Sequence, residues 1–178
     1  MRIFLLRHGE TAWTKTLQHT SHTDLSLTKR GEEEAQALTK RLRGNTFEKV
    51  FSSPLQRVRQ TCAFAGLAEQ AEYTDDLVEW DYGDYEGKTT KEIRQTVPDW
   101  TIFTHGAPGG ESEQEVAARA DRFFARCRSC KGDIAVFTSG HFGRVLGARW
   151  IGFSAKDGRY LLLSTASYSI LGYEREVP

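Results

Sequence analysis

Short apolar runs alternate with helix-like segments along the chain, and this alternation restricts the possible folds more than any other feature. Residues 3–6, 49–52 and 133–138 have the length and composition of buried strands. Segments with helical spacing of apolar residues lie between and after them, at residues 28–43, 53–66, 113–129 and 141–150. Residues 167–173 alternate between apolar and polar and close the sheet. This order predicts an α/β fold, a three-layer α/β/α sandwich around a mostly parallel sheet.

Residues that start or stop a helix mark the ends of these segments. Thr28 is a candidate N-cap and Gly44 a stop for the first long helix. Ser53-Pro54 opens the second helix, because proline is tolerated at the first helical position. Residues 79–111 lack such a pattern, apart from a short helix near 90–96. The aromatic side chains of this stretch favour order, and long loops that are ordered are usually functional.

Composition excludes several classes of partner. The 178 residues fit one domain spanning 1–178, and 24 basic residues balance 24 acidic ones. A net charge of zero gives no general attraction to nucleic acid or to an anionic membrane. No stretch approaches the roughly 20 apolar residues of a membrane span. The small, odd number of cysteines (Cys62, Cys127 and Cys130) favours a reducing cytoplasm. A homodimer is possible.

Polar residues follow three of the predicted strands at the point where each ends. Arg7 and His8 follow the first strand, Arg57 lies just beyond the second, and Ser139-Gly140-His141 follows the late strand. The carboxyl ends of parallel strands share one edge of a sheet, where ligands bind in such folds. Arginine binds phosphate oxygens bidentately, and a helix that begins at Gly140 adds backbone donors. The sequence therefore predicts an anion pocket that contains a nucleophile.

Motifs distributed over nearly the whole chain resemble those of the phosphoglycerate-mutase-like histidine phosphatases. They are residues 6–13 (LRHGETAW), 24–28 (DLSLT) with Gly31, 53–61 (SPLQRVRQT), 79–87 (EWDYGDYEG), 109–112 (GGES) and the turn at 139–141. Residues 79–83 (EWDYG) and the segment from Asp99 to Gly106 are more similar to the broad-specificity acid phosphatases and the sugar-bisphosphatase branch than to the glycolytic mutases. The long insertion of the mutases is missing.

The resemblance implies a catalytic role for each matching residue. His8 would attack phosphorus and carry a phosphohistidine, while Arg7 and Arg57 hold the phosphoryl oxygens. The two cations would also keep His8 neutral near pH 7. Glu79 would protonate the leaving alcohol, with Glu10 as the less favoured acid. This chemistry hydrolyses phosphate monoesters, most simply small sugar or acid phosphates, and needs no metal or other cofactor.

One departure from the family pattern concerns catalysis directly. Family members place a second catalytic histidine before the glycine that aligns with Gly140, and this chain has Ser139 there. Three explanations remain open: His141 replaces the missing imidazole, Ser139 donates a weaker hydrogen bond in a slower enzyme, or the histidine was replaced to trap a ligand. Losing one transition-state donor costs on the order of 10²–10³ in rate. A milder departure is Thr14, where many relatives carry asparagine.

The partner implied by this reading is a small phosphorylated metabolite. The candidate substrate-binding residues are Glu10, Thr14, Lys15, His19, His22, Trp80, Tyr82, His105 and Gly140. Two alternatives remain: a phosphoryl-transferring mutase, and a phosphate-ligand binder weakened by the serine. We interpret Cys127-x-x-Cys130 as structural and His19-x-x-His22 as part of the substrate loop, since neither pair has enough neighbouring ligands for a metal.

Overall fold

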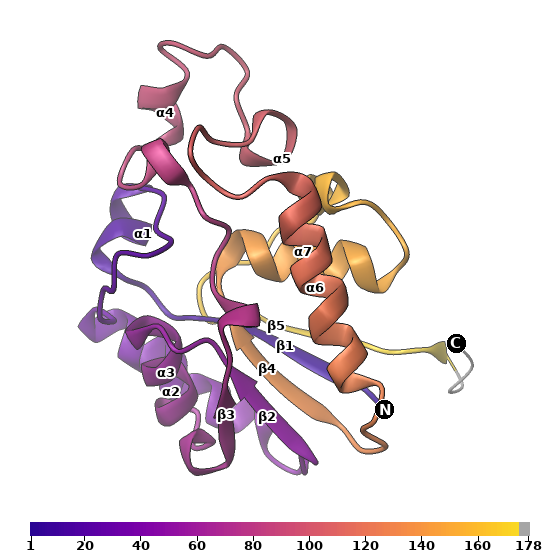
Figure 1. Cartoon of the computed structure of the whole chain (residues 1–178). Helices are drawn as coiled ribbons and strands as arrows, with labels where there is room; N and C mark the ends of the chain where they lie inside the picture. Colours follow the sequence, from indigo (N-terminus) through magenta and orange to yellow (C-terminus); the bar gives the residue numbers. More distant parts are fainter. Residues whose placement is uncertain (175–178) are drawn as a thin grey trace.

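The computed structural model describes residues 1–174 and centres on a five-stranded sheet (Figure 1). The strands are β1 (Ile3–Arg7), β2 (Lys49–Ser52), β3 (Ala71–Tyr73), β4 (Ile134–Thr138) and β5 (Tyr168–Leu171), in the spatial order β3-β2-β4-β1-β5. All neighbouring pairs are parallel except β1 and β5, which are antiparallel. The predicted mostly parallel sheet is therefore confirmed.

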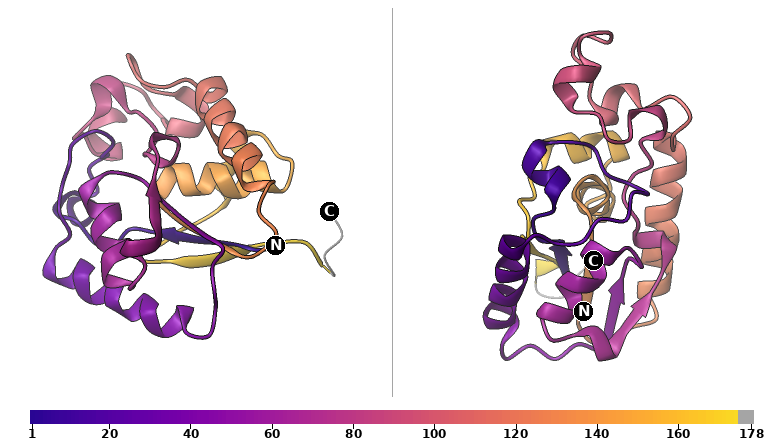
Figure 2. Two further views of the ribbon diagram at one scale, coloured as in Figure 1. Left: turned by 60° about the horizontal axis from the view of Figure 1, so that its bottom comes forward. Right: turned by 90° about the vertical axis from the view of Figure 1, so that its left-hand side faces the viewer.

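Helices cover both faces of this sheet (Figure 2). They are α1 (Ala12–Thr16), α2 (Lys29–Leu42), α3 (Gln56–Phe64), α4 (Thr90–Ile93), α5 (Ile102–His105), α6 (Glu113–Cys127) and α7 (Gly140–Trp150). Short 3₁₀ turns lie at Ala68–Gln70, Asp75–Leu77, Gly83–Tyr85 and Ala155–Tyr160. Helices α2 and α3 lie on one face, and α6 and α7 lie on the other. This arrangement confirms the three-layer α/β/α fold class.

Two apolar cores result from the alternation of side chains along the strands. Ile3 and Leu5 of β1 point to the core formed with α6 and α7. Phe4 and Leu6, the intervening residues, point to the core formed with α2 and α3. All four are buried, and burying each stabilises the fold by about 1.5–3 kcal/mol. The sheet is thereby fixed between its two helical layers.

Two helix boundaries differ from those predicted, and one strand was not predicted. Helix α3 begins at Gln56 rather than at Ser53-Pro54, because the backbone N–H of Ser53 still bonds to Phe137 in strand register with β4. The helix near 90–96 ends at Ile93, ahead of Pro98, which disfavours helical backbone before it. Strand β3 gave no sequence signal, since it has three residues at the sheet edge and none of them is buried.

The stretch from residue 79 to 111 is ordered, as its aromatic content predicted. Trp80, Tyr82, Trp100 and Phe103 are buried in the core beside α6 and α7. The indole N–H of Trp80 donates to the backbone oxygen of Glu111 at 2.8 Å, and Trp100 makes the equivalent bond within the same stretch. This segment, which carries α4 and α5, extends over the carboxyl ends of the strands (Figure 1).

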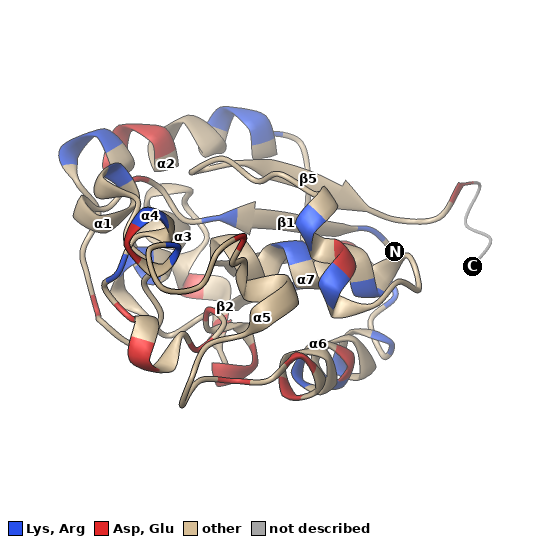
Figure 3. Ribbon diagram, turned by 90° about the horizontal axis from the view of Figure 1, so that it is seen from above, with Lys and Arg blue, Asp and Glu red and all other residues tan. Residues whose placement is uncertain are grey.

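Charged residues of both signs are interspersed over the helices, as the balanced composition implies (Figure 3). A concentration of positive charge therefore has to come from local placement of side chains. Within residues 1–174, no helix has the length and apolar character needed to cross a membrane.

A close contact between two glycines fixes the turn that follows β1. A Cβ atom on Gly9 would lie 2.4 Å from the backbone oxygen of Gly31. One on Gly31, in the first turn of α2, would lie 2.1 Å from the backbone oxygen of Glu10. Both positions need glycine because backbone atoms occupy the space of a side chain. The residue that follows the Arg7-His8 pair is therefore packed directly on α2.

We predict that Gly31→Ala lowers the free energy of unfolding by about 3 kcal/mol, because the backbone has to move apart to admit the methyl group. The matched control is Gly44→Ala, where φ is +83° and no atom lies within 4 Å of the added Cβ. That change should cost only about 1 kcal/mol of backbone strain. Urea unfolding of both variants checks the difference, and equal losses would contradict the steric account.

Candidate active site

The ends of β1 and β4 place His8 at the centre of the carboxyl edge of the sheet. The backbone N–H of His8 donates to Thr138 at 3.1 Å, so the strand pairing continues up to the histidine. The N–H of Gly9 donates to the hydroxyl of Thr61 in α3 at 3.0 Å. The His8 side chain is 4 % exposed. Its position is therefore set by three different elements of the fold.

The protonation state of His8 follows from its surroundings. Burial and the positive charges of Arg57 and Arg7 hold its pKa well below the ordinary value of 6.5. Its Nδ1 lies 2.8 Å from the backbone oxygen of Gly9. A carbonyl oxygen can only accept, so Nδ1 carries the proton and Nε2 holds the free lone pair. His8 is thus a neutral imidazole with its nucleophilic nitrogen available.

Two arginines beside His8 retain unused donors. Arg57 is fully buried and donates from its Nη atoms to the backbone oxygens of Thr20, Ser21 and Thr23. Arg7 donates from Nη1 to the backbone oxygen of Leu163 at 2.5 Å. The Nε atoms of both arginines are buried and have no partner among the described residues. Unpaired buried donors on cations are costly, so an oxyanion that reached either Nε atom would be stabilised by it.

Helix α7 begins beside Arg7. A Cβ on Gly140, the first residue of the helix, would lie 3.0 Å from Cζ of Arg7. Glycine therefore lets the guanidinium lie directly against the start of the helix. The amino terminus of a helix also carries a partial positive charge that favours anions.

Glu79 occupies the position of an N-terminal cap for α7. Its carboxylate accepts from the backbone N–H groups of His141 at 3.0 Å and Phe142 at 2.7 Å, and from that of Trp80 at 2.9 Å. Ser139 is the N-cap residue by position, yet its side chain makes no capping bond. The Ser139 hydroxyl oxygen is buried and has no partner among the described residues. Glu79 therefore holds the helix start that Ser139 leaves uncapped.

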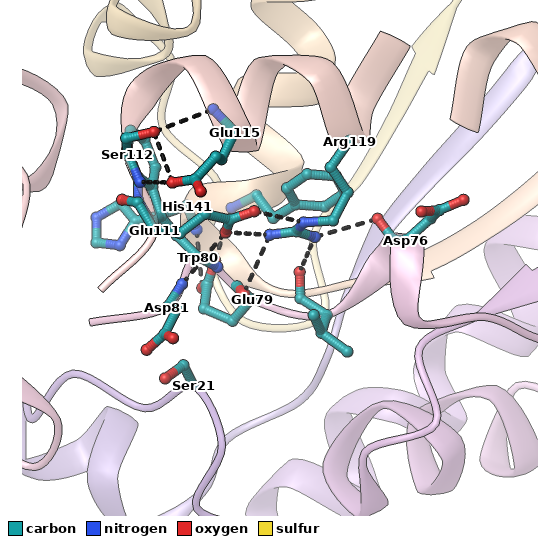
Figure 4. A network of polar contacts seen from close by, with 12 residues as sticks. Ser21, Asp76, Glu79, Trp80, Asp81, Glu111, Ser112, Glu115, Arg119 and His141 are labelled. Atoms are coloured by element: carbon teal, nitrogen blue, oxygen red, sulfur yellow. Dashed lines mark hydrogen bonds and ion pairs between the residues drawn. The ribbon is translucent and has the colours of Figure 1, made fainter. Parts of the chain in front are cut away.

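A buried arginine of α6 holds the segment that carries Glu79 (Figure 4). Arg119 forms an ion pair with Glu111 at 2.6 Å and donates to the backbone oxygens of Val78 and Glu79. Its guanidinium also lies over the ring of Phe142, 4.0 Å from the centroid. One side chain therefore contacts both the segment that carries Glu79 and the helix that Glu79 caps.

Tyr82 and His141 form a second buried pair in the site. The Tyr82 hydroxyl lies 2.5 Å from Nδ1 of His141. Burial and the nearby Glu79 raise the pKa of Tyr82 well above 10, so its hydroxyl keeps the proton and donates it. Burial and the charge of Arg144 hold the pKa of His141 well below 6.5, so its ring is neutral and accepts. His19 packs against both rings, and burial lowers its pKa to about 4.

A single cavity of about 840 Å³ connects most of these groups. The candidate residues that line it are Arg7, His8, Thr14, His19, Glu79, Tyr82, Gly140 and His141. Arg57 and Ser139 are buried and do not line it. The fold thus brings together the predicted nucleophile, the predicted acid and four of the nine predicted substrate-binding residues.

Five candidate substrate-binding residues lie outside this cavity. Glu10 accepts from the Thr28 hydroxyl, Lys15 is exposed on α1, and His22 pairs with Asp81 at 3.2 Å. Trp80 is buried in the core, and the exposed His105 contacts Thr104. Within the described part of the chain, no group of three or more His, Cys, Asp or Glu side chains is placed to hold a metal ion.

Several cavity residues were not predicted from the sequence. Arg144 lines the cavity and donates to the backbone oxygens of Gly158 and Arg159. Its spacing of four from Gly140 puts it on the same helix face, a signal that could have identified it. Lys91 and Arg94, which follow the start of α4, had no comparable signal because the irregular stretch gave no register.

Comparison with known proteins agrees with the geometry. The family model for the histidine phosphatase superfamily (branch 1) matches residues 3–178. The chain belongs to this superfamily. The resemblance inferred from its motifs is confirmed, and the chain is an enzyme of the phosphatase class.

Individual relatives place the chain within the superfamily. It is 39 % identical over 180 residues to an acid phosphatase of Mycobacterium tuberculosis, covering 99 % of this chain and 88 % of the relative. It is 33 % identical over 187 residues to sedoheptulose 1,7-bisphosphatase of Saccharomyces cerevisiae, covering 87 % and 69 %. The solved structure of an open reading frame from Mycobacterium tuberculosis matches with a TM-score of 0.93 and 39 % identity, covering 99 % and 93 %. These matches confirm the predicted similarity to the acid phosphatase and sugar-bisphosphatase branch.

We predict that inorganic phosphate binds between Arg7, His8 and Arg57 and stabilises the fold. At about 100 times the dissociation constant the gain is roughly 2.7 kcal/mol, which corresponds to a rise of about 5 °C or more in Tm. Arg7→Met should abolish the rise. Arg149→Met, which removes a surface pair with Asp121, should retain it. A phosphate-dependent rise that survives in Arg7→Met would contradict the assignment.

We further predict that stability falls below pH 6.5. His8, His19 and His141 have folded-state pKa values below 6.5, so the unfolded chain binds more protons as the pH drops. Their contribution is fully present above pH 6.5 and is lost as the pH falls toward 4, by up to about 1.4 kcal/mol per pH unit for each histidine. Urea unfolding between pH 7 and pH 5 measures the slope. His8→Gln removes one of the titrating histidines, so the slope of stability against pH should decrease by the equivalent of one proton. An unchanged slope in that variant would contradict a neutral His8.

Proposed function

We propose that this chain hydrolyses phosphate monoesters through a phosphohistidine formed on Nε2 of His8. The observation that carries the proposal is the hydrogen bond from Nδ1 of His8 to the backbone oxygen of Gly9, which leaves Nε2 unprotonated. The unpaired Nε donors of Arg7 and Arg57 beside it suit a phosphoryl group. Membership of the histidine phosphatase superfamily supports the same chemistry.

In the first step, Nε2 of His8 bonds to phosphorus as the ester P–O bond breaks. Arg7 and Arg57 neutralise the charge on the equatorial phosphoryl oxygens, where it spreads in the transition state. The leaving oxygen takes a proton from Glu79 in its protonated form. Oε1 of Glu79 accepts from both Trp80 and Phe142, so the proton is carried by Oε2, which accepts from His141 alone among the described residues and keeps a second lone pair.

In the second step, water attacks phosphorus and the P–N bond breaks. Glu79, now ionised, takes the proton of the water and returns to its starting state. Inorganic phosphate leaves and His8 is again neutral. The role of Arg119 is to keep Glu79 within reach of both leaving group and water. No metal or other cofactor is needed for either step.

The substrate class follows from the relatives and from the cavity. The named relatives are an acid phosphatase and a sedoheptulose 1,7-bisphosphatase, and the second name supports small phosphorylated sugars as substrates here. Small acid phosphates stay a prediction from the sequence. His19, Tyr82 and Thr14 are the cavity-lining residues that we assign to the leaving group. The three free cysteines, two of them buried, support work in the cytoplasm.

A second candidate function is favoured by one observation. Ser139 lies at the family's second catalytic position with an unpaired, buried hydroxyl, so the chain lacks the cationic donor that relatives have there. A site with this loss would bind phosphate ligands and turn them over slowly. Turnover of an aryl phosphate by the wild-type protein, absent in His8→Gln, distinguishes an enzyme from a binder. Formation of an isomerised phosphoester instead of free phosphate would indicate a mutase.

We predict that Glu79→Gln affects substrates according to their leaving group. Loss of the acid should lower kcat on an aliphatic phosphate by about 10²-fold or more, but on para-nitrophenyl phosphate by much less, because that leaving group scarcely needs a proton. Glu10→Gln is the matched control and should affect both substrates equally. Equal losses in Glu79→Gln would show that Glu79 is not the acid. A Tm of Glu79→Gln close to that of the wild-type protein shows that α7 remains capped.

We predict that Ser139→His raises kcat by at least about tenfold with little change in KM. A histidine can donate a charge-assisted bond that strengthens as negative charge develops, whereas the serine hydroxyl is neutral. Steady-state kinetics on one substrate measures this. The competing explanation assigns the role to His141. It would be supported by a nearly inactive His141→Ala together with no gain in Ser139→His.

A further inference from the structure

Two leucines line the active-site cavity and are nevertheless strongly exposed to solvent. Leu17, at the end of α1, is 75 % exposed, and Leu162, in the loop before β5, is 88 % exposed. The deeper part of the same cavity is formed by Arg7, His8 and Glu79. The phosphate end is therefore deep, and these two apolar side chains lie at the mouth.

Leu17 is held in an unfavourable conformation. Its φ is +63°, a left-handed value that costs a side chain other than glycine or asparagine about 1 kcal/mol. Its neighbours are fixed, because Gln18 donates to the backbone oxygen of Gly87 at 2.8 Å and pairs with Thr89 as an isolated β-bridge. Leu17 is the C-cap of α1, where its backbone N–H bonds to the backbone oxygen of Trp13, so its backbone is fixed while its side chain stays exposed.

Leu162 is flanked by two leucines that are anchored. Leu161 lies against α7, where its Cδ1 would be 2.7 Å from a Cβ on Gly147. The backbone oxygen of Leu163 accepts from Nη1 of Arg7. The loop that presents Leu162 is therefore tied to the arginine that faces the phosphate. Leu162 itself lines the cavity, and most of its surface remains in contact with solvent.

The cavity is also larger than a small phosphate monoester requires. Its volume of about 840 Å³ lies toward the upper end of ligand pockets, which span about 300–1,000 Å³. Its lining also includes the polar groups of His19 and Thr90 and the long side chains of Lys91 and Arg94. A phosphate at His8 with a short alcohol would leave the mouth unfilled.

We propose that the preferred substrates are phosphate monoesters whose alcohol carries an apolar chain or ring long enough to cover Leu17 and Leu162. This inference rests on the proposed function, because it takes the phosphate to be held at His8. Covering an exposed leucine removes apolar surface from water, so each added methylene strengthens binding once the chain reaches the mouth. Within the class of small phosphorylated sugars and acids, those without an apolar group leave both leucines exposed and are then the weaker substrates.

The test is the binding of n-alkyl phosphonates from ethyl to octyl, measured by titration calorimetry. A phosphonate occupies the phosphate end without being hydrolysed, so turnover does not affect the result. We expect the dissociation constant to fall about two- to fourfold per methylene over the longer members, since burying one methylene is worth about 0.8 kcal/mol at most. Constants that do not depend on chain length would overturn the inference.

Variants test whether Leu17 and Leu162 cause the dependence of binding on chain length. Leu17→Asn, which tolerates the left-handed backbone, combined with Leu162→Ser should remove most of the dependence on chain length and leave ethylphosphonate binding unchanged. Ile151→Ser, at an apolar residue that is 57 % exposed but does not line the cavity, should leave the dependence intact. The same dependence in the wild-type protein, the double variant and Ile151→Ser would overturn the assignment to the two leucines.

Hydrolysis of n-alkyl phosphates separates this inference from the function on which it rests. Length-dependent binding without any release of phosphate would refute the enzyme and keep the binding preference. Release of phosphate at rates that ignore chain length, with length-independent binding, would keep the enzyme and refute the preference.

Discussion

The hydrogen bond from Nδ1 of His8 to the backbone oxygen of Gly9 determines what the site can do, because it decides which ring nitrogen is free. Burial and the charges of the two guanidinium groups lower the pKa of His8, so its imidazole stays neutral. In the neutral ring only one nitrogen is nucleophilic, and the carbonyl at 2.8 Å claims the proton of the other. The unpaired Nε donors of Arg7 and Arg57 serve the proposed phosphoryl transfer only because that nitrogen is free to attack.

Contacts from both helical layers hold this arrangement in place. The contact between Gly9 and Gly31 places the turn after β1 directly on α2, and the N–H of Gly9 is tied to α3. On the other face, Arg119 of α6 holds the segment of Glu79, which in turn caps α7. Elements from both helical layers therefore converge on the carboxyl edge of the sheet. His8, Arg7, Arg57 and Glu79 each also bond to the backbone, which holds their side chains in place.

Much of this could be predicted from the sequence, and the remainder depended on tertiary contacts. Strand-length apolar runs and helix caps located β1, β4, α2 and α7, and residues at strand ends indicated Arg7, His8 and Arg57 as neighbours. Two facts about Glu79 and Tyr82 were not accessible: that the first caps α7, and that the second donates to His141. Their partners lie about 60 residues away, across an irregular stretch with no helical or strand period. Arg119 was missed for a different reason. In the sequence, a buried arginine of an amphipathic helix cannot be told from an arginine on the solvated face.

The measurement that tests the central claim most directly is the nitrogen NMR spectrum of His8 in the free protein, assigned by comparison with His8→Gln. Long-range proton–nitrogen correlations distinguish the two neutral tautomers from the imidazolium ion. The account predicts a proton on Nδ1 and none on Nε2 at pH 8, and the same state as the pH passes below the ordinary histidine value of 6.5. A proton on Nε2 in the neutral ring, or a doubly protonated ring near pH 6, would contradict it.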